Sequence, residues 1–200
     1  MQQIELELAG GGVLTVSLRA SLDAMPAVKE RPLVLVVPGG GYDHVSPREG
    51  DPVALQFAAA GYHTAVLTYS VGEGAQNYRP LRQLNEALAL LRQNAGEWHI
   101  LPDKIAVCGF SAGGHLAASA ATMLPEEVRP AFAVLIYPVI TAEPGKCHKG
   151  SFDHLLGTDR TAGDEAQWSL QNRVTASTPP TLLLLADDGR TVPPGNSTLF

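Results

Sequence analysis

The fold of this chain is decided by one stretch, Val107-Cys108-Gly109-Phe110-Ser111-Ala112-Gly113-Gly114-His115. The stretch contains Gly109-x-Ser111-x-Gly113, the spacing of a nucleophile elbow, in which a strand turns sharply into a helix and exposes the central serine. A β-prone apolar segment at 105–108 precedes the motif, and small residues with good helix propensity follow it at 116–121. This context favours the elbow over a chance match. We predict that a Cβ in place of either motif glycine would collide with the neighbouring strand or helix.

Strand patterns lie on both sides of this stretch and alternate with helical ones. Residues 33–37 form a continuous apolar run, typical of a strand buried on both faces of a parallel sheet. Apolar spacing and helix-end signals predict helices over 51–60 and 80–94. Further strands are predicted at 64–69, 131–137 and 181–186. The alternation indicates an α/β fold: a mostly parallel sheet with helices on both faces and functional residues at the carboxyl ends of its strands.

The remaining segments complete one domain, which we expect to span residues 1–200. Alternating residues at 4–8 and 13–18 flank a Gly-Gly-Gly turn and predict an N-terminal antiparallel hairpin. Residues 20–32 are expected to form a loop. Residues 141–175 are predicted to be irregular, with short helices near 151–156 and 164–171, and to form a lid or pocket wall above the site.

The amino-acid composition limits the classes of protein to which this chain can belong. The chain is 45% hydrophobic and 17% charged, the balance of a globular protein. Its net charge of −6, without a run of Lys or Arg, argues against nucleic acid or an anionic membrane as a partner. Two cysteines make no disulfide framework, and residues 1–30 lack a secretion signal. We therefore expect a cytoplasmic location, and the sequence is compatible with a homo-oligomer.

The serine of the elbow needs further groups before it can act as a nucleophile. Nucleophilic serine chemistry requires a base, a group that orients the base, and donors for the oxyanion. The amide of Ala112 and those of residues 39–41, after the strand at 33–37, are candidate donors. Asp187 and Asp188 directly follow the strand at 181–186, the position of the orienting acid. On the residues alone, that role and an ordinary solvated turn are equally supported.

Four segments together resemble the α/β-hydrolase superfamily, and more narrowly the bacterial esterase/lipase group that includes acetylxylan-esterase-like and hormone-sensitive-lipase-like enzymes. The resemblance runs from about Arg31 to Phe200. Pro38 stands where the hormone-sensitive-lipase-like branch has histidine, which favours the acetylxylan-esterase-like branch. The segments are Pro38-Gly39-Gly40-Gly41-Tyr42, Gly109-Phe110-Ser111-Ala112-Gly113-Gly114-His115-Leu116-Ala117, Tyr137-Pro138-Val139, and Ala186-Asp187-Asp188 with Val192-Pro193-Pro194-Gly195-Asn196-Ser197.

The resemblance implies an eight-stranded sheet, a Ser–Asp–His triad, and hydrolysis of short acyl esters of small molecules without cofactor or metal. It makes Ser111 the nucleophile and Asp188 the acid, with Asp187 as the alternative. The oxyanion-hole amides would be those of Gly40, Gly41 and Ala112. The candidate pocket residues are Tyr42, His44, His115 and His154.

The base that this fold requires is missing from the expected place. In the α/β-hydrolase order, histidine follows the acid, but residues 189–200 contain none. Our hypothesis is a C-terminally incomplete esterase that lacks the last helix and strand. It predicts little Ser111-dependent turnover, an exposed edge at 181–186 and a tendency to aggregate.

Upstream histidines are the only substitutes that the chain offers. His148 and His154 flank the irregular segment, and His154 is the best candidate of the two. His115 is expected to have a structural role, bonding a nearby loop, and His44 to shape the pocket. The alternative functions are a serine peptidase of the same fold and a non-catalytic ligand-binding protein that keeps the elbow as a scaffold.

Overall fold

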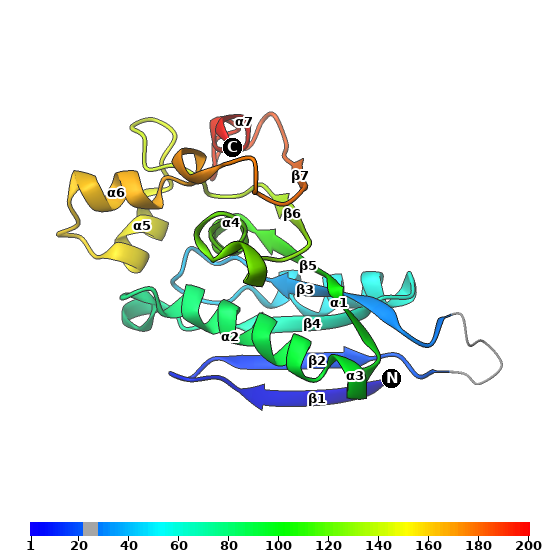
Figure 1. The fold of residues 1–200 in the computed structure, drawn as a ribbon. Coiled ribbons are helices and arrows are strands. Elements are labelled where there is room, and N and C mark those ends of the chain that lie inside the picture. The colour runs from blue at the N-terminus through cyan, green and yellow to red at the C-terminus, as the bar shows by residue number, and fades with distance from the viewer. Residues whose placement is uncertain (22–27) are drawn as a thin grey trace.

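The computed structural model describes residues 1–21 and 28–200, which form one seven-stranded sheet with helices around it (Figure 1). The strand order is β1-β2-β4-β3-β5-β6-β7. The strands are β1 Gln2–Glu7, β2 Val13–Leu18, β3 Arg31–Val37, β4 His63–Thr68, β5 Ile100–Phe110, β6 Phe132–Ile136 and β7 Thr181–Leu184.

The sheet is mostly parallel, as the sequence predicts. β1 pairs with β2 and β2 with β4 in antiparallel fashion, so the predicted N-terminal hairpin is confirmed. The pairs β4–β3, β3–β5, β5–β6 and β6–β7 are all parallel. The predicted strand boundaries are displaced by a few residues, most of all in β5. β5 begins at Ile100, upstream of residue 105, where Ile100 already pairs with Arg31 of β3. β7 ends at Leu184, where its pairing with β6 ends.

Helices cover both faces of the sheet. The helices are α1 Asp51–Ala59, α2 Arg79–Gln93, α3 Ala95–Trp98, α4 Ser111–Met123, α5 Lys149–Leu156, α6 Ala162–Trp168 and α7 Gly195–Leu199, with short 3₁₀ turns η2 Pro47–Glu49, η3 Gly72–Ala75, η4 Glu126–Val128 and η5 Leu170–Arg173. α2 and α4 pack on one face and α1 on the other.

β3 shows why a continuous apolar run is needed in the centre of such a sheet. Leu33, Leu35 and Val37 join the large core beneath α2 and α4, while Val34 and Val36 join the smaller core beneath α1. All five side chains are buried. The strand is therefore buried on both faces, as its sequence predicts.

The segment between β6 and β7 carries α5, α6 and η5 beyond the carboxyl ends of the strands (Figure 1). Both predicted short helices are present, shifted by a few residues. α6 begins with a capping box. The Thr161 hydroxyl accepts a hydrogen bond from the Asp164 amide, and the Asp164 carboxylate accepts one from the Thr161 amide. This local signal marks where α6 begins more sharply than apolar spacing does.

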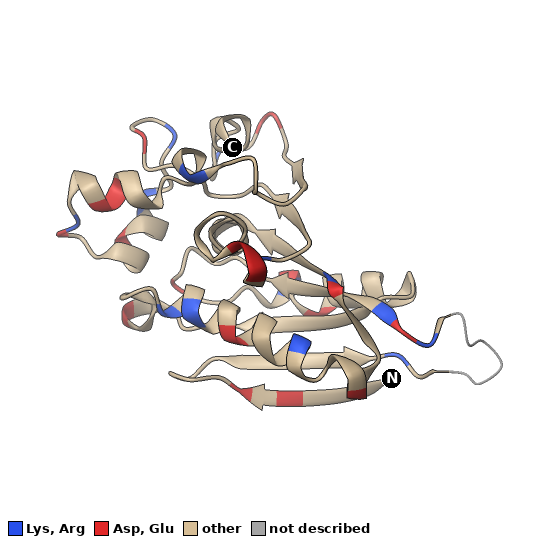
Figure 2. Ribbon diagram, in the orientation of Figure 1, with Lys and Arg blue, Asp and Glu red and all other residues tan. Residues whose placement is uncertain are grey.

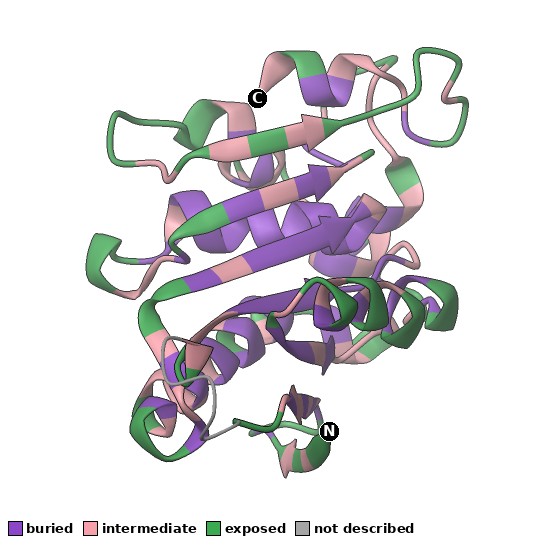
Figure 3. Cartoon of the chain, turned by 90° about the vertical axis from the view of Figure 1, so that its right-hand side faces the viewer, coloured by how far each residue is buried: buried purple, intermediate pink, exposed green. Residues whose placement is uncertain are grey.

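The sheet ends at β7, which pairs only with β6 among the described residues and carries no charged side chain, so that Figure 2 shows it in tan. Leu182 and Leu184 are 46% and 45% exposed, and Figure 3 shows exposed residues along this strand in contrast to buried β5. The predicted exposed edge is thus present, and the eighth strand implied by the family resemblance is absent from the described residues. Across residues 1–21 and 28–200, no helix is long and apolar enough to cross a membrane.

Candidate functional site

The turn between β5 and α4 places Ser111 in a strained conformation. Its φ is 51°, in the left-handed region that side chains with a Cβ rarely adopt. A Cβ on Gly109 would lie 2.3 Å from the Gly113 carbonyl oxygen, and one on Gly113 would lie 2.2 Å from the carbonyl oxygens of Val37 and Pro38. The prediction that both glycines avoid collisions is therefore confirmed.

Residues 39–41 turn tightly after β3 beside Ser111; we call them the oxyanion loop, after the role that the sequence predicts for their amides. Gly40 has a φ of 123°, and a Cβ there would lie 2.1 Å from the His44 carbonyl oxygen. The loop carbonyls accept hydrogen bonds from the amides of residues 43, 44 and 46. Within the described part of the chain, the amides of Gly40, Gly41 and Ala112 donate to no protein acceptor. These N–H groups are free to bind a ligand oxygen.

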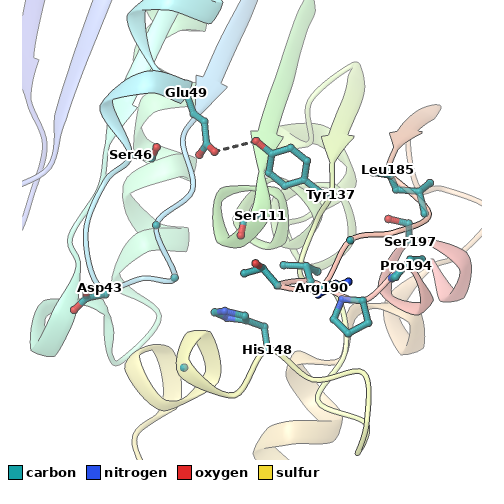
Figure 4. Close-up of a pocket in the computed structure, with 18 of the residues that line it drawn as sticks. Asp43, Ser46, Glu49, Ser111, Tyr137, His148, Leu185, Arg190, Pro194 and Ser197 are labelled. Atoms are coloured by element: carbon teal, nitrogen blue, oxygen red, sulfur yellow. Dashed lines mark hydrogen bonds between the residues drawn. The ribbon is translucent and has the colours of Figure 1, made fainter.

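A cavity of about 570 Å³ opens beside Ser111. Its walls come from the oxyanion loop, η2, the start of α5 and the loop that follows β7. Figure 4 shows the Ser111 hydroxyl facing the space between these walls. A cleft of this size with a few polar groups suits a small ligand.

His148 lines the cavity and also caps α5. Its Nδ1 accepts a hydrogen bond from the Ser151 amide at 3.3 Å and lies 2.8 Å from the Ser151 hydroxyl oxygen. The same amide also donates to the His148 carbonyl oxygen at 3.0 Å, and because an amide can only donate, its contact with Nδ1 favours the neutral tautomer with the proton on Nε2. Burial, with a contribution from His154, lowers the pKa of His148 and favours this neutral form. His148 therefore offers the cavity a donor.

His154 and His44, two predicted pocket residues, also line the cavity. His154 Nδ1 lies 3.1 Å from the Gly41 carbonyl oxygen, to which it donates, and its Nε2 lies 3.6 Å from the Asp43 carboxylate. His44 approaches the same carboxylate at 3.3 Å. Both nitrogens of His154 thus face protein groups, which does not suit it for the role of substitute base, for which the sequence offered it only as one upstream candidate.

Tyr42 and His115 do not line this cavity, contrary to our expectation. Both are buried beneath it, with His115 Nδ1 2.9 Å from the Tyr42 hydroxyl and Nε2 2.9 Å from the Trp168 carbonyl oxygen. The carbonyl can only accept, so Nε2 carries the proton and Nδ1 accepts from Tyr42. Burial lowers the pKa of His115 to about 4. His115 thus bonds the backbone at the end of α6, and both rings face a separate small space lined by Val139, Ser151, Phe152 and Leu155.

Asp187 and Asp188 lie in an exposed turn after β7. Neither residue lines the cavity, although residues 185, 186 and 189–194 on both sides of them do. Their carboxylates make no hydrogen bond to any described residue. The structure thus brings Ser111 and the loop amides together but leaves the predicted acid outside the group.

Glu49 is a residue that the sequence did not single out. It is only 7% exposed, and its Oε2 accepts a hydrogen bond from the Gly39 amide at 2.8 Å. Its Oε1 accepts one from the Tyr137 hydroxyl at 2.9 Å, drawn in Figure 4. Burial, together with this hydrogen bond, raises the pKa of Tyr137. Nothing local distinguishes Glu49 from the exposed glutamates of the chain, so only the packed structure shows it.

No metal ligand set accompanies these groups. Residues 1–21 and 28–200 contain no cluster of three or more His, Cys, Asp or Glu side chains that could hold a metal ion.

Comparison with known proteins gives a family match and curated relatives. The model of the BD-FAE family matches residues 23–130. An acetylxylan esterase of Xylanibacter ruminicola is 35% identical over 164 residues, which cover 80% of this chain and 34% of that protein. Endo-1,4-beta-xylanase B of Butyrivibrio fibrisolvens is 33% identical over 186 residues, covering 86% of this chain and 29% of that protein. The chain thus spans about a third of the length of these relatives.

Solved structures show the same fold. An acetyl ester-xyloside bifunctional hydrolase from Caldicellulosiruptor lactoaceticus is 34% identical with a TM-score of 0.87, covering 95% of this chain and 71% of that one. The carboxylesterase Cest-2923 from Lactobacillus plantarum is 27% identical with a TM-score of 0.85, covering 100% and 77%.

Proposed function

The chain belongs to the BD-FAE family, and from this premise we propose that it is a serine carboxylic ester hydrolase that cleaves short acyl esters. One observation carries the proposal: a strained serine on the wall of a cavity stands beside three backbone amides that donate to no acceptor among the described residues. Preorganised amides of this kind stabilise negative charge that develops on an ester oxygen. Similarity to proteins described as acetylxylan esterase and carboxylesterase supports the same chemistry.

In the proposed mechanism, Ser111 Oγ attacks the ester carbonyl carbon and the carbonyl oxygen becomes an oxyanion. The amides of Gly40, Gly41 and Ala112 donate to that oxygen, and the N-terminus of α4 adds a partial positive charge. Collapse of the tetrahedral intermediate expels the alcohol and leaves an acyl group on Ser111. Water then releases the carboxylic acid.

The proton of the Ser111 hydroxyl needs an acceptor, and His148 and His154, two of the histidines that line the cavity, are poorly prepared for this role. His148 holds its proton on Nε2, the nitrogen left for the cavity, and both nitrogens of His154 face protein groups. We propose that Asp188 is the acid that orients the base of the reaction. Ser111 then supplies the nucleophile, and the amides of Gly40, Gly41 and Ala112 supply the oxyanion site.

We further propose that the alcohol part of the substrate is a sugar hydroxyl, on the strength of the similarity to an acetylxylan esterase. A sugar carries many oxygen atoms that accept hydrogen bonds. The cavity offers it the Nε2 donor of His148 and the guanidinium group of Arg190.

The test is hydrolysis of p-nitrophenyl acetate by the chain beside a Ser111→Ala control, with imidazole added as an external base. We expect a slow Ser111-dependent rate that rises with imidazole after the control is subtracted, and an acetyl group on Ser111 in the intact-mass spectrum. Equal rates for both proteins at every imidazole concentration, without an adduct, would exclude the proposal.

One observation favours a second function, ligand binding without catalysis: neither His148 nor His154, both of which line the cavity, is prepared as a base for Ser111. This alternative predicts saturable binding of a small ester with no turnover in imidazole. Calorimetric titration with a slowly hydrolysed acetylated sugar, beside the rate measurement, separates the two.

A further inference from the structure

We propose that Glu49 is a positioning residue that locks the oxyanion loop against the end of β6. The inference rests on the proposed function, because it assigns the loop amides to the oxyanion hole. Glu49 itself is not placed in contact with the reacting atoms.

The burial of Glu49 needs an explanation. A carboxylate removed from water is costly unless donors compensate for the lost hydration. Here the donors are the Gly39 amide at 2.8 Å and the Tyr137 hydroxyl at 2.9 Å. Arg48, the nearest cation at 3.9 Å, has a side chain that is 87% exposed, so water screens its contribution. The two hydrogen bonds are the contacts that hold the carboxylate in place.

The first of these bonds fixes the orientation of the loop. By taking the Gly39 amide, Glu49 leaves the next two amides of the loop, those of Gly40 and Gly41, for a ligand. A Cβ on Gly39 would lie 2.9 Å from Glu49 Oε2 and 3.0 Å from Ser111 Cβ. The carboxylate and the nucleophile therefore pack against the same side of Gly39, which leaves no room for a side chain there.

The second bond ties the loop to another part of the sheet. Tyr137 directly follows β6, and its amide donates to the Leu184 carbonyl at the end of β7 at 2.6 Å. Its ring packs against Phe110, the residue before the nucleophile, with 5.9 Å between ring centres. Through Glu49, the end of β3 is linked to the ends of β5, β6 and β7, where the cavity opens.

The charge of Glu49 is not what the proposed role requires. A negative charge near the oxyanion disfavours it, so hydrogen bonding is the useful property of the side chain. A glutamine can accept from the Gly39 amide with its oxygen and donate to the Tyr137 oxygen with its nitrogen. Glu49→Gln thus keeps the geometry and removes the charge, whereas Glu49→Ala removes both.

The experiment measures the rate at which a fluorophosphonate labels Ser111, by intact mass in a fixed imidazole concentration, together with amide hydrogen exchange of the oxyanion loop. We expect Glu49→Ala to slow labelling about 10- to 100-fold and to speed exchange at Gly39, because the loop amides lose their alignment. Glu49→Gln should stay close to the wild-type rate. Gln83→Ala, which removes another buried side chain with several hydrogen bonds but outside the cavity, should leave labelling unchanged.

Three outcomes would overturn the inference: wild-type labelling and exchange in Glu49→Ala, a Glu49→Gln rate as low as that of Glu49→Ala, or equal slowing in Gln83→Ala. Tyr137→Phe removes only one hydroxyl and replaces Glu49→Ala if that variant does not fold. An intermediate labelling rate is then expected, and an unchanged one contradicts the link. If wild-type Ser111 is not labelled at all, the proposed function fails, while Gly39 exchange still tests the Glu49 contact.

Discussion

At the scale of single residues, the candidate site depends on positions where a side chain cannot fit. The left-handed conformation of Ser111 stores about 1–3 kcal/mol of strain, which the surrounding packing must hold. Because Gly113 has no side chain, α4 can approach the end of β3 closely. A Cβ at this position would collide with the carbonyl oxygens of Val37 and Pro38. The strained backbone of Ser111 can form only because the glycines beside it have no side chains that would collide with the neighbouring backbone.

This arrangement predicts the effect of Gly113→Ala. The new Cβ would lie 2.2 Å from the carbonyl oxygens of Val37 and Pro38, so backbone must move. We expect the free energy of unfolding, measured in urea, to fall by about 1–3 kcal/mol or more. Gly96→Ala is the matched control, since a Cβ there meets nothing within 4 Å in the helix α3. It should be neutral or stabilising by up to about 1 kcal/mol, and an equal loss in both variants would contradict the prediction.

His148 has two roles that substitution can separate. His148→Ala removes the cap of α5 and should cost about 1 kcal/mol of stability, measured by urea unfolding. His148→Asn can keep the cap, because its oxygen also accepts from an N-terminal amide, but it loses the Nε2 donor. In the imidazole assay, we expect both variants to raise KM for an acetylated sugar about tenfold and to leave KM for p-nitrophenyl acetate unchanged. Equal changes for both substrates would remove the proposed role in sugar binding.

At the scale of elements, β7 is the weak part of the sheet. It is a short edge strand whose alternate side chains, Leu182 and Leu184, are nearly half exposed. An apolar strand edge with free backbone groups is a template for pairing with another chain. The structure therefore gives a physical basis for the predicted aggregation.

Charges on β7 should suppress this association. We expect the unaltered chain to show a weight-average mass that rises with concentration in light scattering, and Leu182→Glu with Leu184→Glu to reduce the rise. Leu55→Glu provides the control, because Leu55 is 54% exposed but lies on α1, away from the edge. A monodisperse monomer for the unaltered chain at all concentrations would show that the edge does not pair.

At the scale of the whole molecule, His115 joins segments that are distant in sequence. It connects α4 to Tyr42 beside the oxyanion loop and to Trp168 at the end of α6. Both hydrogen bonds suit the neutral ring. A proton added to Nδ1 would place a positive charge in a buried site and require the Tyr42 hydroxyl to turn and accept instead of donate.

This arrangement predicts how stability depends on pH. The folded pKa of His115 is about 4 against an ordinary 6.5, so below pH 6.5 the unfolded chain takes up a proton that the folded protein does not. Unfolding free energy should therefore be highest above pH 6.5 and fall towards pH 4, by about 3 kcal/mol from this group. His63 and His148, whose pKa values are also lowered, act in the same direction. His115→Gln should show a shallower slope between pH 6.5 and 4 in urea unfolding, and an equal slope would contradict this.

Much of the fold could be read from local patterns. The apolar run of β3, the glycines around Ser111 and the hairpin before them act through the size, shape and periodicity of residues close together in the chain. For that reason the mostly parallel sheet, its order of elements and the elbow were all predictable. The exact ends of β5 and β7 were not, because a strand ends where its partner does.

The roles of the polar residues around Ser111 required the tertiary structure. Glu49 meets Tyr137 across 88 positions of sequence, and His115 meets Tyr42 across 73. Whether a carboxylate is buried or an imidazole is neutral depends on such remote partners, as does which amides remain unpaired. Side-chain type and spacing can indicate a serine nucleophile, but solvent exclusion and hydrogen-bond geometry around it arise only when distant segments pack together.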